Sequence, residues 1–113
     1  MDSKDKKTAI VVAHTHWDRE WRYPIWKTRS LLIEFMDWLL EILETDPTYS
    51  GFLLDGQTVC IDDYLEIKPE NKERIAVQVR AGKLAIAPLY TLPDLFPFAD
   101  ACLVRNLTKV IRF

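Results

Sequence analysis

Short apolar runs alternate with longer stretches of helical periodicity along this chain. Three such runs, at residues 9–13, 51–55 and 84–90, are rich in aliphatic side chains and nearly uninterrupted. Continuous apolar runs of this length are typical of strands that are buried on both faces. Because Pro88 has no backbone N–H to donate, the third strand is expected to bend or fray there.

Helical periodicity fills the intervals between these runs and the end of the chain. Four helices are predicted, over residues 30–44, 58–67, 69–80 and 98–113. The first is the clearest, because Leu32, Leu39 and Leu43 recur on one face and Asp46-Pro47 stops the pattern.

The third helix carries its own start and stop signals, since Pro69 stands at its first position and Gly82 follows its last turn. The alternation of strands and helices predicts an α/β fold class with parallel strands, whose carboxyl ends meet at one edge of the sheet. Chemistry in such folds collects at that edge. Three strands would leave two open edges, which is typical of the first three βα units of something larger.

Composition narrows the candidate functions. With 113 residues, 49% of them hydrophobic, the chain has the length of one domain at most. A net charge of -2 leaves no basic footprint for nucleic acid or an anionic membrane. Cys60 and Cys102 lie far apart, which favours reduced structural thiols. Residues 9–13 are too few for a signal-peptide core or a membrane span, so a cytoplasmic location is expected.

Both histidines of the chain fall at the predicted carboxyl end of the first strand. In an extended strand, side chains two residues apart share a face, so His16 and Asp18 can converge on one point. Imidazole and carboxylate are ligands that a zinc-type ion takes. His14 could join them or point into the core. A hydrogen-bonded core histidine beside a turn aspartate explains the same spacing, which is common by chance.

Aromatic residues crowd the same loop. Exposed rings at Trp17, Trp21 or Trp26 would suit stacking on the apolar face of a sugar. Core or lid packing is the alternative for all three. Packing is the favoured interpretation for Trp26 and for Trp38, which lies inside the first helix.

Charged residues near the ends of the strands are further candidates. Asp55 and Asp94 follow the second and third strands, where many α/β folds place active-site carboxylates. Turn formation beside Gly or Pro explains both equally well. Arg19, Glu20 and Arg22 could orient a substrate by charge, although a solvated, mutually paired turn is the favoured interpretation.

Residues 11–21 read Val-Val-Ala-His-Thr-His-Trp-Asp-Arg-Glu-Trp, which resembles the opening motif of glycoside hydrolase family 38, the zinc-dependent retaining α-mannosidases. Other stretches resemble the bacterial, cytoplasmic branch of that family: Leu54-Asp-Gly-Gln-Thr58, Asp63-Tyr64, Lys68-Pro-Glu-Asn-Lys72, Ala81-Gly-Lys-Leu84, Tyr90-Thr91 and Val104-Arg-Asn-Leu107. The resemblance covers essentially the whole chain. One departure is Ala87-Pro-Leu-Tyr90, where the family pattern has Gly-Pro-Trp-Tyr, so the floor of the site is expected to differ locally.

The resemblance implies that residues 1–113 form three βα units of a (β/α)7-type barrel, the N-terminal part of a catalytic domain. His16 and Asp18 would be two of four ligands of one Zn2+, Trp21 would stack on the bound mannose, and His14 would lie outside the ligand set. The family's nucleophile and acid/base would lie beyond Phe113, so the 113 residues alone are expected to be inactive.

The resemblance also implies the substrate and the partner. The substrates would be α-mannosides such as mannosylglycerate or mannose oligosaccharides. The partner would be the remainder of the catalytic domain, with neither nucleic acid nor a membrane involved.

Two alternatives remain open. In an amidohydrolase-like barrel, an H-x-H pair after the first strand binds metal and activates water, so His14 and His16 would both be ligands. In the other alternative, the chain is a non-catalytic remnant or a partner-dependent module that docks its open sheet edge on another protein. Metal binding after substitution of His14 separates the first alternative from the family 38 interpretation.

Overall fold

The structure is a mixed α/β fold built around a small parallel sheet. The computed structural model describes residues 6–54, 56–93 and 100–110. Strand β1 (Phe52–Leu54) pairs in parallel with β2 (Leu84–Ile86). The predicted α/β class and the parallel arrangement of these two strands are therefore confirmed.

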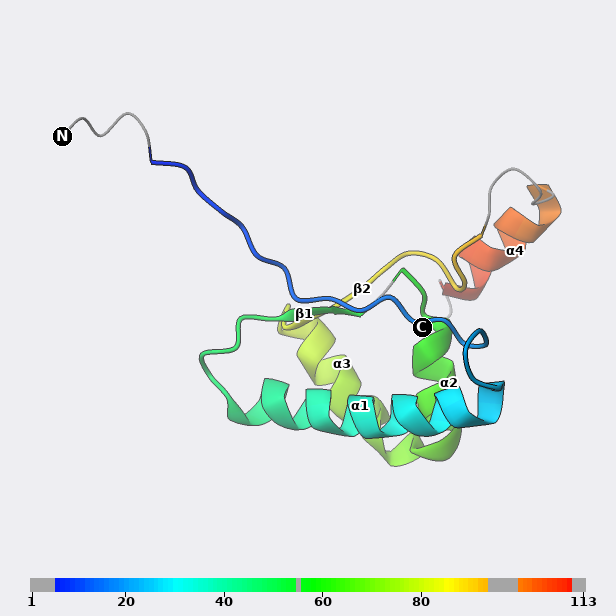
Figure 1. Cartoon of the computed structure of the whole chain (residues 1–113), viewed down its shortest axis with the longest axis horizontal. Coiled ribbons are helices and arrows are strands. Elements are labelled where there is room, and N and C mark those ends of the chain that lie inside the picture. The colour runs from blue at the N-terminus through cyan, green and yellow to red at the C-terminus, as the bar shows by residue number, and fades with distance from the viewer. Residues whose placement is uncertain (1–5, 55, 94–99, 111–113) are drawn as a thin grey trace.

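A third segment lies along the other edge of β1. Leu53 forms a parallel bridge with His14. Its N–H donates to the Ala13 carbonyl at 2.9 Å, and its own carbonyl accepts from the Thr15 N–H at 3.3 Å. The three segments consequently lie side by side in the order in which they follow along the chain (Figure 1).

The α helices are α1 (Ile25–Thr45), α2 (Val59–Ile67), α3 (Lys72–Arg80) and α4 (Asp100–Val110), with a 3₁₀ turn (Pro69–Asn71) before α3. The helices α1, α2 and α3 lie on the same side of these strands (Figure 1). α1 packs against α2 and α3, and α3 packs against β2. Each predicted helix is present, although residues 98, 99 and 111–113 of the last one lie outside the described residues. α1 begins earlier than predicted, because the Pro24 carbonyl already accepts from the N–H groups of Lys27 and Thr28.

α3 stops where the sequence predicts. Gly82 has a φ of +72°, in the left-handed region that glycine adopts without strain. Its N–H donates to the Val79 carbonyl and the Lys83 N–H donates to the Gln78 carbonyl, both at 3.0 Å. These bonds satisfy the last carbonyls of the helix and turn the chain directly into β2.

One hydrophobic core lies between the helices and the strands. α1 contributes a stripe of buried side chains, as its periodicity predicts. The core consists of Leu32, Met36, Leu39, Leu40, Leu43, Leu54, Val59, Cys60, Ile61, Tyr64, Ile75 and Leu84. Burying one aliphatic side chain of this size stabilises the fold by about 1.5–3 kcal/mol, so this cluster dominates the stability of the chain.

A polar network ties α1 to α2 at the edge of this core. The Tyr64 hydroxyl donates to Asp37 Oδ1 at 2.6 Å and accepts from Asn71 Nδ2 at 2.5 Å, while Lys68 Nζ donates to Asp37 Oδ2 at 3.0 Å. Burial raises the pKa of Tyr64 to about 12. The hydrogen bond from Tyr64, followed by the contact with Lys68, lowers the pKa of Asp37. Asp37 therefore stays ionised over the ordinary pH range and holds the two helices together.

Two tryptophans contradict the packing predicted for them. Trp26 is 70% exposed and Trp38 is 73% exposed. Each lies two helical positions from a buried residue of α1, Trp26 before Thr28 and Trp38 after Met36. Two positions turn a helix by about 200°, so both rings point away from the core.

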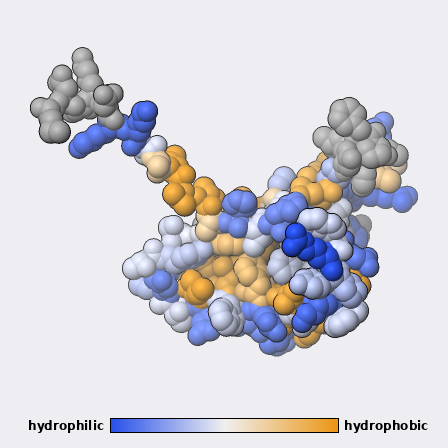
Figure 2. Space-filling model, in the orientation of Figure 1, coloured by the Kyte–Doolittle hydropathy of each residue, from blue (hydrophilic) through white to orange (hydrophobic). Residues whose placement is uncertain are grey.

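The prediction that residues 9–13 form a strand buried on both faces is also wrong. Residues 6–13, here called the N-terminal arm, contain no assigned strand, and Ile10, Val11 and Val12 are 86%, 92% and 59% exposed. Figure 2 shows the arm running outward from the body, with hydrophobic residues along its inner part and a hydrophilic outer part. A strand is buried on both faces only when neighbours cover it, and in the described part of the chain the backbone of the arm is hydrogen-bonded to β1 only at its last residue, Ala13.

β2 ends at Ile86, before the proline that was expected to bend it. The chain beyond Pro88 is held both by α4 and by the backbone at the start of α2. Asn106 Oδ1 accepts from the N–H groups of Tyr90 and Thr91 at 2.6 and 3.1 Å, and Asn106 Nδ2 donates to the Thr91 carbonyl at 2.6 Å. The carbonyls of Leu89 and Tyr90 in turn accept from the N–H groups of Thr58 and Val59 at 2.9 and 3.0 Å, beside a parallel bridge between Gln57 and Leu89. The buried amide of Asn106 thus adds to strand-type bonds that continue beyond the proline.

Candidate functional site

Exposure alternates along residues 14–21, here called the site segment. The even-numbered residues from 14 to 20 are exposed, and the odd-numbered residues from 15 to 19 are partly buried. Because side chains alternate across an extended chain, one side of the segment faces the body and the other faces solvent. His16 and Asp18 share the outward side, as their spacing predicts.

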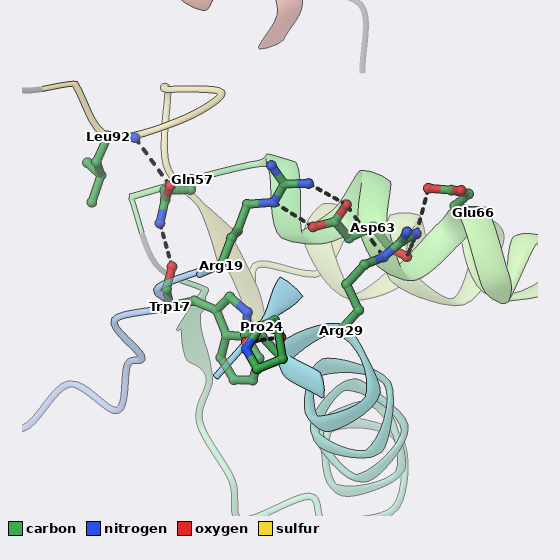
Figure 3. Close-up of polar contacts among 9 residues, drawn as sticks. Trp17, Arg19, Pro24, Arg29, Gln57, Asp63, Glu66 and Leu92 are labelled. Carbon is green, nitrogen blue, oxygen red and sulfur yellow. Dashed lines mark hydrogen bonds and ion pairs between the residues drawn. The ribbon is translucent and has the colours of Figure 1, made fainter. Parts of the chain in front are cut away.

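Trp17 attaches the inward side of the segment to the body. Its ring stacks on Phe35 of α1, with the ring centroids 5.9 Å apart. Gln57 Nε2 donates to the Trp17 carbonyl at 2.7 Å, and the Leu92 N–H donates to Gln57 Oε1 at 3.4 Å (Figure 3). Trp17 is therefore a packing residue, which was one of the two interpretations left open for it.

Arg19 attaches the same side to α2. Arg19 Nε donates to Asp63 Oδ2 at 2.7 Å and Arg19 Nη2 donates to Asp63 Oδ1 at 2.9 Å, a bidentate pair that Figure 3 shows. The hydrogen bond to Asp63 raises the pKa of the Arg19 guanidinium. The predicted solvated turn of mutually paired charges is thus wrong for Arg19, whose partner lies on another element of the fold.

The outward side carries the candidate ligands. His16 Nε2 lies 3.5 Å from Asp18 Oδ1, and the two side chains are 64% and 45% exposed. Together with Glu20 and Trp21 they line an open hollow of about 540 Å³. The structure therefore brings the predicted imidazole and carboxylate to one accessible place, beside an aromatic ring.

His14 and Trp21 differ in their relation to this hollow. His14 is exposed but does not line it; its Nδ1 lies 3.1 Å from the Thr15 carbonyl. Trp21 lines it and is 73% exposed, with the Arg22 guanidinium 5.1 Å from its ring centroid. An exposed ring at the rim of a polar hollow suits stacking on a sugar, and Trp21 is not packed in the core of the described part of the chain.

Two other candidates cannot be placed. Asp55 and Asp94 lie outside the described residues. In the described ranges, no cluster of three or more His, Cys, Asp or Glu side chains could hold a metal ion. Within those ranges the structure does bring His16 and Asp18 together as a pair.

Sequence reasoning missed Asp63 as part of this neighbourhood. Asp63 lies four positions after Val59 and three after Cys60, both of which are buried. A carboxylate on the apolar face of a helix is costly to bury without a cationic partner. The placement of Asp63 on the apolar face of the predicted helix therefore indicated that it needs a cationic partner. It did not indicate that this partner is Arg19.

Comparison with known proteins identifies the family to which this chain is similar. Residues 6–113 match the model of the glycosyl hydrolases family 38 N-terminal domain. The chain belongs to glycoside hydrolase family 38. A protein of Halalkalibacterium halodurans named "Putative mannosylglycerate hydrolase" is 45% identical over 107 residues, which make up 95% of this chain and 12% of that protein.

Solved structures of family 38 members are similar as well. An α-mannosidase from Enterococcus faecalis V583 matches with a TM-score of 0.83 at 45% identity. A family 38 protein from Enterococcus faecalis matches with a TM-score of 0.77 at 41% identity. Each match covers 88% of this chain and 11% of the other chain, so this family 38 chain spans only a small part of the length of its relatives.

The resemblance seen in the sequence is therefore confirmed at the level of the family. Relatives in it include α-mannosidases, which are glycoside hydrolases. Neither the amidohydrolase-like barrel nor the remnant is favoured by these matches. None of the helices in the described ranges is long and apolar enough to cross a membrane.

Proposed function

We propose that this family 38 chain forms the N-terminal part of the catalytic domain of a zinc-dependent, retaining α-mannosidase. The observation that carries the proposal is the placement of His16 and Asp18 on one side of the site segment, within a chain that matches the family. The complete domain would be a (β/α)7-type barrel, in which neighbouring strands cover the N-terminal arm. The pairing of Leu53 with the chain beside His14 supports a parallel start for such a barrel.

The donor set fits a zinc ion. Imidazole nitrogen and carboxylate oxygen are standard zinc ligands, and two ligands about 2.1 Å from a tetrahedral ion lie about 3.4 Å apart. His16 Nε2 and Asp18 Oδ1 are 3.5 Å apart and exposed, so neither must leave the core to reach an ion. These two residues would supply part of the ligand set, and the remainder of the catalytic domain would supply the rest.

The substrate would be an α-mannoside, with mannosylglycerate and mannose oligosaccharides as candidates. A zinc ion bound there would hold sugar hydroxyls and favour a distorted ring. Trp21 would stack on the apolar face of the mannose, beside the hollow that it lines. Retaining hydrolysis needs a nucleophile and an acid/base carboxyl group, and both are expected beyond Phe113. We expect a cytoplasmic protein.

The first experiment is the intact mass of the native polypeptide from its source cells. A mass far above 13.2 kDa supports the proposal, because the missing ligands and carboxyl groups could then be present on the same chain. A mass of 13.2 kDa contradicts an α-mannosidase made of this chain alone and leaves a remnant or a partner-dependent module.

The second experiment separates the roles of the two histidines. We expect His16→Ala to weaken zinc binding by more than the ~10–100-fold that loss of an orienting partner costs, whereas His14→Gln should leave it unchanged. The zinc dissociation constant is measured by competition with a chromophoric chelator. Loss of zinc binding in His14→Gln would instead support an H-x-H metal hydrolase.

The activity of the isolated 113 residues gives a third check. Purified 1–113 supplied with zinc should release no p-nitrophenol from p-nitrophenyl α-mannoside, because the two carboxyl groups of the retaining reaction are expected elsewhere. Measurable zinc-dependent release would contradict this assignment of roles.

A further inference from the structure

The candidate ligands lie on backbone outside the regular elements of the fold. Residues 15–24 belong to no helix or strand, so no regular hydrogen-bond ladder determines their conformation. The Thr15 N–H is bonded to β1 at one end, and α1 begins at Ile25 at the other. Contacts of this segment with the body, among them those of Trp17 and Arg19, therefore contribute to how His16 and Asp18 are presented.

We propose that Asp63 is a positioning residue for this site. Through its two hydrogen bonds with Arg19, it fixes the segment on which the candidate ligands and Trp21 stand. Arg19 is joined directly to Asp18 in the chain, so a displaced Arg19 changes the distance between Asp18 and His16. The inference rests on the zinc site of the proposed function.

Asp63 has the properties of a rigid support. Its side chain is only 8% exposed, and it lies on α2 between residues that are fully buried, Cys60 and Tyr64. A bidentate carboxylate–guanidinium pair fixes the orientation of the guanidinium as well as its position. Arg19 is therefore held on an element that cannot move without disturbing the core.

A second arginine helps to hold the carboxylate. Arg29 of α1 places its Nε 3.9 Å from Asp63 Oδ1, and its Nη2 donates to the Asp63 carbonyl at 3.4 Å and to Glu66 Oε2 at 2.5 Å (Figure 3). Asp63 thus lies between cations from two elements, whereas Glu66 contacts Arg29 and is 68% exposed. This difference between two acidic residues of one helix supplies a matched control.

The test compares Asp63→Asn with Glu66→Gln in the full chain, meaning the complete native polypeptide with the remainder of the catalytic domain that would supply the other zinc ligands. Asparagine keeps the shape of the side chain but loses the charged bidentate acceptor that Arg19 uses. We expect about tenfold weaker zinc binding in Asp63→Asn, at the lower end of the cost for groups that orient metal ligands. Glu66→Gln should leave the zinc dissociation constant unchanged, because it does not touch Arg19.

Thermal unfolding of each variant shows whether the measurement is made on folded protein. Should Asp63→Asn fail to fold, Arg19→Lys replaces it, since lysine keeps the charge partner of Asp63 but loses the fork. The same weakening of zinc binding is expected there. A purely structural role for the pair would lower the unfolding temperature and leave the zinc affinity of the folded chain unchanged.

The outcomes distinguish this inference from the proposal beneath it. If His16→Ala loses zinc while folded Asp63→Asn or Arg19→Lys binds it as tightly as the original chain, the positioning role is wrong and the zinc site stands. If Glu66→Gln weakens zinc binding as much as Asp63→Asn, the effect is one of general charge and the positioning role is again wrong. A full chain that binds no zinc overturns the zinc site and the inference with it.

Discussion

The N-terminal arm and α1 are both rich in large aliphatic side chains, yet their surroundings are opposite. In the arm, Val11 is 92% exposed, whereas Met36 and Leu40 of α1 are 0% exposed. α1 meets its packing partners α2 and α3 inside the described chain, while the backbone of the arm is hydrogen-bonded to β1 there at Ala13 only. The difference shows that apolar side chains become buried only where a neighbouring element packs against them.

Hydrogen exchange should give the largest contrast between the two regions. In the 113-residue chain, amides of residues 10–12 are expected to exchange at least about a thousandfold faster than those of residues 36–40, because the core opens only on global unfolding. Equal protection in both regions would contradict the comparison. In a longer polypeptide with a complete barrel, the arm should become as protected as a central strand, because neighbouring strands would then cover it.

Matched truncations give the next largest effect. Leu40→Ala should lower the free energy of unfolding by about 2–5 kcal/mol, because it opens a cavity in the core. Val11→Ala should change it by less than about 0.5 kcal/mol in the 113-residue chain, since its side chain is exposed. Urea denaturation followed by circular dichroism measures both. A cost for Val11→Ala close to that for Leu40→Ala would mean that the arm is packed in solution.

The smallest expected effect concerns the polar tie between α1 and α2. Tyr64→Phe removes the hydroxyl that donates to the ionised Asp37, and it should cost about 1.5–3 kcal/mol at neutral pH. Tyr23→Phe, at an exposed site, is the control and should be neutral.

The pH dependence of the same variant has a definite sign. Tyr64 is the largest cause of the lowered pKa of Asp37. A lowered carboxyl pKa contributes stability that is present above its ordinary value, about 4, and is lost as pH falls through the lowered value. The difference between the original chain and Tyr64→Phe should therefore narrow below about pH 4 in denaturation measured across pH. A constant difference from pH 7 to pH 3 would argue against an ionised Asp37 as the acceptor.

Much of the fold follows from local patterns. The stripe of α1, the stop at Gly82 and the end of β2 before Pro88 each depend on residues that lie close together in the sequence. The outward pairing of His16 with Asp18 follows from the same kind of rule, because side chains alternate along an extended segment. Their proposed role as zinc ligands stays a prediction.

The sequence by itself determined the family, the helices and the pair of candidate ligands, because each is encoded in contiguous motifs or short periodicities. Only the tertiary structure decided that the arm is uncovered, that Trp38 faces solvent and that Arg19 is held by Asp63. Those outcomes depend on which distant elements meet in space. The chemistry of a side chain determines which kind of partner stabilises it, an apolar neighbour or an opposite charge. The tertiary structure determines whether such a partner lies next to it.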